Sequence, residues 1–173
     1  MINLLLFLTG LLLDTDINSN MMNGFEAYGD LMQFFCAFLT FFLFVNKDYL
    51  ASAQMILGMC IALGIMYTSK LFFIYLSNHD HIELARISQR PNNGSFDGFP
   101  SGHSTGSFLA AGFICKKYGF KIGIFAIIIA ALVAISRVYA GKHTVIQVIC
   151  GSILGFFVTY ALTDSKIFAK YLR

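Results

Sequence analysis

Six apolar stretches, separated by short polar breaks, restrict the fold of this chain more than any other feature. They cover approximately residues 2–13, 31–46, 51–76, 103–119, 122–139 and 143–163. A helix of about 20 apolar residues crosses the hydrocarbon core of a bilayer. Charged residues make up only 12% of the chain, against about 25% in a typical soluble domain. The sequence therefore predicts a single domain, residues 1–173, that is an all-α integral membrane protein with six transmembrane helices.

Two longer polar segments, residues 14–30 and 77–100, interrupt this pattern and are predicted to be loops. The second contains both prolines and several Asn, Gly, Ser and Asp residues, which are typical of loops. The first apolar stretch, 2–13, is short for a full span. It lacks the basic residues and the cleavage site of a signal peptide, so we expect a short or tilted first helix.

The alternate loops of a six-helix arrangement differ in charge. One set contains the basic residues Lys47, Lys116, Lys117, Lys121, Lys166, Lys170 and Arg173, whereas the opposite set contains most of the acidic residues. Because basic loops tend to stay in the cytoplasm, both termini are predicted to be cytoplasmic and the loop 77–100 to lie outside. The net charge of +3, without a basic run, gives no reason to expect a nucleic-acid partner.

Ionisable residues gather at the helix ends on this outer side. Arg90 precedes the fourth predicted helix, which begins near His103, while Arg137 ends the fifth helix and His143 begins the sixth. Charged groups in membrane helices are costly and tend to be functional. Since helices three to six each have one end on this side, we expect a site at the outer membrane–water interface.

Phosphoryl transfer is the chemistry that such a set of residues suits. Arginine binds phosphate oxygens through two parallel hydrogen bonds. A helix N-terminus offers free amides, and Gly102 would let the backbone approach an anion closely. One histidine can attack phosphorus while another protonates the leaving oxygen. No cluster of carboxylates suited to Mg²⁺ or Zn²⁺ accompanies them, so neither a metal nor another cofactor is expected.

Three ordered motifs carry a family resemblance: Arg-Pro at 90–91, Pro-Ser-Gly-His at 100–103, and Ser-Arg-x5-His at 136–143. Together they resemble the signature of the type 2 phosphatidic acid phosphatase superfamily, over roughly residues 70–150. The resemblance implies metal-independent hydrolysis through a phosphohistidine, with His143 as nucleophile and His103 as general acid. It also implies that the phosphate is held by Arg90, Arg137, Ser101 and the amide of Gly102.

The first motif departs from the family pattern, which usually has Lys seven residues before its Arg. Glu83 stands at that position here and cannot bind phosphate. Lys70, at the end of the third predicted helix, is the expected replacement because that helix enters the site from the same side. The Thr-Ser-Lys run at 68–70 and the stretch 94–104 are similar to the bacterial lipid A 1-phosphatase branch.

The second departure is Gln147, where the family usually has Asp four residues after the nucleophilic His. Residues i and i+4 share one face of a helix, so Gln147 is expected to complete the catalytic set by accepting a hydrogen bond from His143. An amide oxygen brings no charge, and Gln147→Asp is therefore predicted to raise kcat. If another acceptor, with Asp97 as a candidate, already orients His143, the same change would instead lower activity.

The resemblance implies a membrane lipid as substrate and the bacterial inner membrane as location, with the active site on the periplasmic or exterior side. Lipid A 1-phosphate is the favoured substrate. Undecaprenyl diphosphate and phosphatidylglycerol phosphate are the alternatives within the family. A different hypothesis is a catalytically impaired membrane protein that binds lipid headgroups, which Glu83 and Gln147 would fit. The sequence leaves the oligomeric state open.

Overall fold

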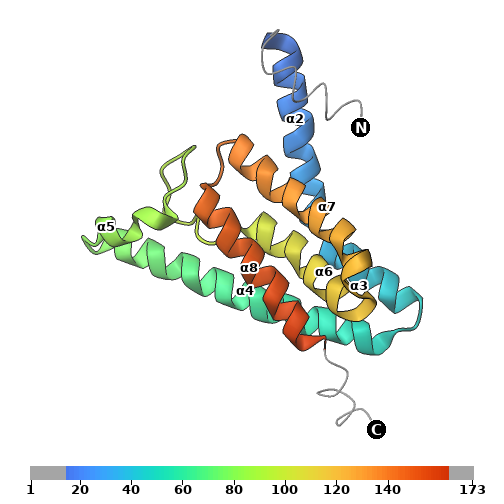
Figure 1. Ribbon diagram of the computed structural model, residues 1–173. Coiled ribbons are helices and arrows are strands. Elements are labelled where there is room, and N and C mark those ends of the chain that lie inside the picture. The colour runs from blue at the N-terminus through green and yellow to red at the C-terminus, as the bar shows by residue number, and fades with distance from the viewer. Residues whose placement is uncertain (1–14, 164–173) are drawn as a thin grey trace.

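The computed structural model of the protein describes residues 15–163, which form helices joined by loops, without a strand in this range (Figure 1). The helices are α2 (Thr15–Met32), α3 (Phe35–Val45), α4 (Tyr49–Asn78), α5 (Ile82–Ala85), the 3-10 helix η2 (Arg86–Ser88), α6 (Gly102–Tyr118), α7 (Phe120–Tyr139) and α8 (Val145–Leu162). Five of the predicted stretches correspond to α3, α4, α6, α7 and α8. The sixth, 2–13, lies outside the described residues. The prediction of an all-α protein is confirmed for the described part.

Helices α4, α7 and α8 are each long and apolar enough to cross a membrane. The segments Asn23–Met32 and Phe35–Val45, bent by 43° at their junction, satisfy the same criterion as one broken span. Their outer faces carry large apolar side chains, such as Phe41, Phe125 and Phe157, which are more than half exposed and suit contact with lipid. The described residues thus support three or four spans, and six spans remain a prediction.

Helix α6 does not meet the criterion for a span because it is short and lies among the other helices. It contacts α3, α4, α7 and α8, and many of its residues are small and fully buried. Small residues let membrane helices approach closely. At Gly155 of α8, an added Cβ would lie 2.3 Å from the carbonyl oxygen of Thr105. This contact fixes α8 against α6, which sets the positions of their N-terminal ends.

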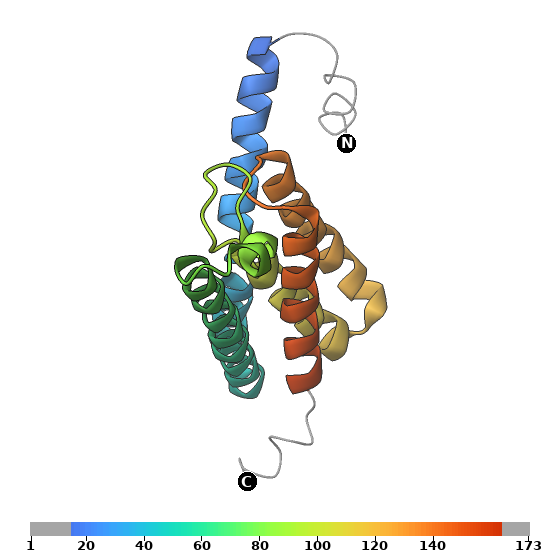
Figure 2. The ribbon, with the colours of Figure 1, turned by 90° about the vertical axis from the view of Figure 1, so that its left-hand side faces the viewer.

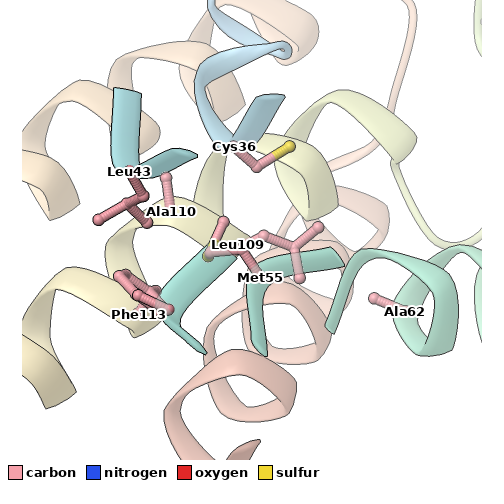
Figure 3. Close-up of a cluster of buried hydrophobic side chains, with 8 residues drawn as sticks. Cys36, Leu43, Met55, Ala62, Leu109, Ala110 and Phe113 are labelled. Atoms are coloured by element: carbon pink, nitrogen blue, oxygen red, sulfur yellow. The ribbon is translucent and has the colours of Figure 1, made fainter. Parts of the chain in front are cut away.

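One hydrophobic cluster joins α3, α4 and α6 in the interior (Figure 3). Its buried members are Cys36, Leu43, Ala51, Met55, Ala62, Leu109, Ala110 and Phe113. At the adjoining end of the bundle, the carboxylate of Asp48 caps the first turn of α4 and forms an ion pair with Lys117 at 2.7 Å. These contacts hold the half of the bundle that lies away from the polar helix ends.

The segment 14–30, predicted to be a loop, is instead largely the helix α2, so that prediction is wrong. Figure 2 shows α2 extending past the end of the bundle that carries the long loop. Its C-terminal half packs on α7, where the Tyr28 hydroxyl donates a hydrogen bond to the carbonyl oxygen of Ile129 at 3.0 Å. Gly29 sits so close to α7 that a Cβ there would lie 2.1 Å from Ser136 Oγ. Tertiary contacts thus stabilise a helix that its polar composition does not indicate.

Candidate active site

One end of the bundle gathers the C-terminal ends of α4 and α7 and the N-terminal ends of α6 and α8, beside the loop that follows η2 (Figure 1). Every site residue predicted from the sequence lies on these segments. The charges of Arg90, Lys70 and His103 act on His143, so the four side chains share one electrostatic environment. The predicted convergence of the helix ends is therefore what the structure shows.

His143 is 3% exposed and is held by Gln147. Its Nδ1 lies 3.0 Å from Gln147 Oε1, and the same oxygen accepts a hydrogen bond from the Thr144 amide at 3.2 Å. Gln147 Nε2 donates to the carbonyl oxygens of Ile87 at 2.9 Å and Gln89 at 3.0 Å. All the amide's hydrogen-bonding atoms are therefore paired, which ties the start of α8 to the segment before Arg90.

These partners determine which nitrogen of His143 carries the proton. Two carbonyl acceptors require the NH₂ group of Gln147 on their side, so its oxygen faces His143. An amide oxygen only accepts, and Nδ1 must therefore be the donor. Nε2 then keeps its lone pair. This is the tautomer that a nitrogen nucleophile needs.

Burial is the largest influence on the pKa of His143 and lowers it to about 4, with the charges of Arg90, Lys70 and His103 acting in the same direction and the Gln147 bond opposing them. Because the ring is neutral above that pKa, Nε2 of His143 has an available lone pair at neutral pH. We expect the acid limb of kcat/KM to lie below the ordinary histidine value of about 6.5. Profiles of kcat/KM against pH, measured with two substrates whose phosphate groups have different pKa values, would separate the acid limb caused by His143 from a limb caused by ionisation of the substrate. A shared limb near 6.5 would contradict this prediction.

Gln147→Asp is expected to lower activity and stability, which reverses the direction expected from the sequence. Aspartate has no N–H group, so the carbonyls of Ile87 and Gln89 would each lose a hydrogen bond, worth about 0.5–1.5 kcal/mol. A carboxylate beside two carbonyl oxygens is also costly to bury. We expect kcat to fall about tenfold or more and the Tm to drop, as measured by phosphate release and thermal unfolding. Gln147→Glu, which keeps the side-chain length, separates the effect of exchanging the amide for a carboxylate from the effect of shortening the side chain. A higher kcat with an unchanged Tm in Gln147→Asp would contradict the prediction.

A second cluster contains the cations of the first motif. Arg90 binds Asp97 through two hydrogen bonds, Nε to Oδ1 at 2.7 Å and Nη2 to Oδ2 at 3.0 Å. Lys70 Nζ donates to the backbone carbonyl of Asp97. Burial opposes ionisation of Asp97, but hydrogen bonds from Arg90 and Ser95 outweigh it and lower its pKa to about 2. Asp97 thus holds the two cations together and is not the acceptor for His143 that the sequence suggested.

Lys70 and Glu83 occupy different environments, as the sequence analysis expected. The side chain of Glu83 is 78% exposed and, within residues 15–163, forms an ion pair only with Arg86, its neighbour on the surface. Lys70 instead lies beside Arg90 and Asp97 and acts electrostatically on His143. Lys70, and not residue 83, therefore lies with the cation of the first motif and near His143.

Arg137 lies in the last turn of α7 and its side chain is completely buried. Its guanidinium donates to Asp30 Oδ1 at 2.7 Å, to the carbonyl oxygen of Glu26 at 2.5 Å and to Ser136 Oγ at 3.1 Å. Asp30 Oδ1 also lies 3.0 Å from His103 Nε2. Asp30 was not among the predicted site residues, because it lies in the segment 14–30 that was predicted to be a loop.

The Pro-Ser-Gly-His motif forms the start of α6. Ser101 is fully buried, and its hydroxyl oxygen accepts bonds from the Ser104 amide at 3.5 Å and the Ser104 hydroxyl at 3.2 Å. It is therefore a helix cap, with its hydroxyl turned into the protein. The amides of Gly102 and His103 make no hydrogen bond to a described residue and lie partly exposed. Of this motif, the free amides and the His103 ring are best placed to meet an anion.

An all-α membrane protein whose helix ends bring two histidines together with a lysine and two arginines is, by class, a membrane enzyme built to act on a phosphate group. The chain belongs to the PAP2 superfamily, whose family model matches residues 53–167. It is a lipid phosphatase of that superfamily, as the resemblance of its motifs implied.

Two curated relatives from Helicobacter pylori are similar to the chain. The lipid A 4'-phosphatase of strain J99 is 34% identical over 141 residues, which cover 80% of this chain and 69% of that protein. The lipid A 1-phosphatase of strain 26695 is 33% identical over 89 residues, covering 51% of this chain and 46% of that protein. The chain therefore spans less than half of the second relative.

Among solved structures, the first transmembrane PAP2 type phosphatidylglycerolphosphate phosphatase from Bacillus subtilis matches over 97% of this chain and 93% of its own. The identity is 24% and the TM-score is 0.37. This superposition is too loose to support a comparison of the two sites.

Proposed function

We propose that the protein hydrolyses a phosphate monoester on lipid A without a metal ion, through a phosphohistidine at His143. The observation that carries the mechanism is the unprotonated Nε2 of His143, fixed by Gln147 among positively charged side chains. Similarity to lipid A phosphatases supports the substrate. The 4'-phosphate becomes the favoured position, in place of the 1-phosphate favoured by the sequence, since the 4'-phosphatase matches more of the chain.

The reaction has two steps. In the first, His143 Nε2 attacks phosphorus, the bond from phosphorus to the sugar oxygen breaks, and His103 gives that oxygen a proton. In the second, water attacks the phosphohistidine, His103 takes a proton from it, and the P–N bond breaks to release inorganic phosphate. Lys70, Arg90 and the free amides at the start of α6 bind the phosphate oxygens, while Arg137 supports that end of the site from the interior.

The experiment is a phosphate-release assay of the purified protein with bis-phosphorylated lipid A in the presence of EDTA. Mass spectrometry of the product would show which sugar has lost its phosphate. Undecaprenyl diphosphate and phosphatidylglycerol phosphate serve as competing substrates. The proposal predicts loss of the 4'-phosphate, undiminished by EDTA. Faster hydrolysis of a competing lipid would reject the substrate, and inhibition by EDTA that added metal reverses would reject the mechanism.

For the membrane orientation, we propose cytoplasmic termini and a periplasmic active site, which the basic residues of the opposite loops support. A cysteine introduced in the exposed segment 79–84 should react with an impermeant maleimide in spheroplasts. Labelling that requires membrane disruption would place the site on the other side.

A further inference from the structure

The two histidines of the site have chemically different partners. His143 bonds the neutral amide of Gln147, whereas His103 Nε2 lies 3.0 Å from the carboxylate oxygen of Asp30. A carboxylate only accepts hydrogen bonds, so Nε2 of His103 carries a proton. Nδ1 of His103 bonds no described residue, and the side chain is 25% exposed. His103 thus has one nitrogen held by the protein and one left for the substrate.

Asp30 is fixed in place by several contacts of α2 with the α7 end. Arg137 reaches the Glu26 carbonyl and the Asp30 carboxylate, one turn apart on α2. Lys142 forms an ion pair with the Glu26 side chain. The close approach of Gly29 to Ser136 leaves no room for a side chain between the helices. The carboxylate at position 30 is therefore held beside His103 by a rigid contact.

The charged groups around His103 differ in sign. Asp30 on α2 faces the ring from one side. The charges of Arg137 on α7 and Lys142 in the following turn also act on His103, and His103 in turn acts on the ring of His143. The cations disfavour a charged imidazole, and Asp30 is the carboxylate that offsets them among the described residues. In many active sites, one group acts as the acid and another as the base because their environments shift their pKa values apart.

We propose that Asp30 is a positioning residue for the general acid: it holds His103 by Nε2–H and stabilises its imidazolium, so that Nδ1–H faces the leaving oxygen. This inference rests on the proposed function. When the P–O bond breaks, the Nδ1 proton passes to the sugar oxygen. His103 stays bonded to Asp30 through Nε2–H, and its Nδ1 lone pair then accepts the proton of the attacking water. Asp30 lies outside the region matched by the family, residues 53–167, so the family motifs do not contain it.

Asp30→Asn is the test, because asparagine has the same shape and can still accept a bond from Arg137. With a lipid phosphate substrate, kcat should fall about 10- to 100-fold, a part of the ~10²–10⁴ that a general acid contributes. The alkaline limb of kcat should move to lower pH, since the imidazolium has lost its counter-charge. In single-turnover measurements of the first step with p-nitrophenyl phosphate, whose leaving group needs no proton, the loss should be several-fold smaller than with the lipid. Asp30→Glu, which restores the charge, should restore the alkaline limb.

Asp48→Asn is the matched control, since it removes a carboxylate that is ion-paired to Lys117 in the half of the bundle away from the site. It should leave the alkaline limb where the wild type has it, and thermal unfolding should show that all three variants are folded. An unmoved limb in Asp30→Asn, or equal losses for both substrates, would overturn the proposal. Tighter inhibition of Asp30→Asn by inorganic phosphate, with the alkaline limb unmoved, would also overturn it, because Asp30 would then merely compete with phosphate. If the wild type releases phosphate from no lipid, the proposed function itself fails, which is a separate result.

Discussion

His143→Ala is expected to abolish turnover, with a loss on the order of 10⁵-fold or more, as for other enzymes that lose their covalent nucleophile. Nε2 of His143 is the unprotonated nitrogen that Gln147 leaves free, and alanine offers no replacement. The protein should still fold. The Gln147 amide would lose one bond but keep those to Thr144, Ile87 and Gln89.

Labelling followed by an alkaline denaturing quench, which preserves a P–N bond, measures this directly. With ³²P-labelled substrate, the wild type should retain acid-labile, base-stable phosphate, and a tryptic peptide containing residue 143 should carry it. His79→Ala is the matched control, because His79 is an exposed histidine whose ring stacks on Tyr75 and whose Nδ1 bonds the Tyr75 carbonyl. It should label as the wild type does. Phosphate trapped on another residue in His143→Ala, with turnover retained, would reject the nucleophile.

Much of the fold could be predicted because long apolar runs in a sequence directly indicate membrane helices. The stretch 51–76 became α4, and 122–139 became α7, each within a few residues. The motif residues could also be placed at one end of the bundle, since alternate helix ends share a side. Lys70 lies in the C-terminal third of α4, on the side of the bundle that the order of the spans predicts.

The contacts that tune the site could not be predicted, since they join segments far apart in sequence. Asp30 meets His103 only because α2 is a helix. The polar composition of 14–30 favoured a loop, although Ile17, Met21, Phe25 and Tyr28 recur at the spacing of one helix face. Similarly, the i, i+4 spacing predicts that Gln147 reaches His143. It says nothing of the carbonyls of Ile87 and Gln89, which come from the preceding loop. Those two acceptors explain why an amide suits position 147 in this chain better than a carboxylate does.

His103→Ala is expected to slow hydrolysis of a lipid phosphate by about 10²–10⁴-fold, the usual contribution of a positioned general acid. A sugar alkoxide is a poor leaving group and must be protonated as the P–O bond breaks. The nitrophenolate ion leaves without a proton, so the loss with p-nitrophenyl phosphate should be far smaller. The comparison uses single-turnover rates, because the second step also needs His103 to take a proton from water.

The two steps make the prediction sharper. With p-nitrophenyl phosphate, His103→Ala should form the phosphohistidine quickly and hydrolyse it slowly, so more labelled enzyme should accumulate than in the wild type. His81→Ala, another exposed histidine outside the site, should show neither effect. If His103→Ala loses activity equally with both substrates and accumulates no phosphoenzyme, His103 serves to bind phosphate and another group protonates the leaving oxygen. The Asp30–His103 contact would then act on binding alone, and both variants would change KM and leave the pH profile of kcat unaltered.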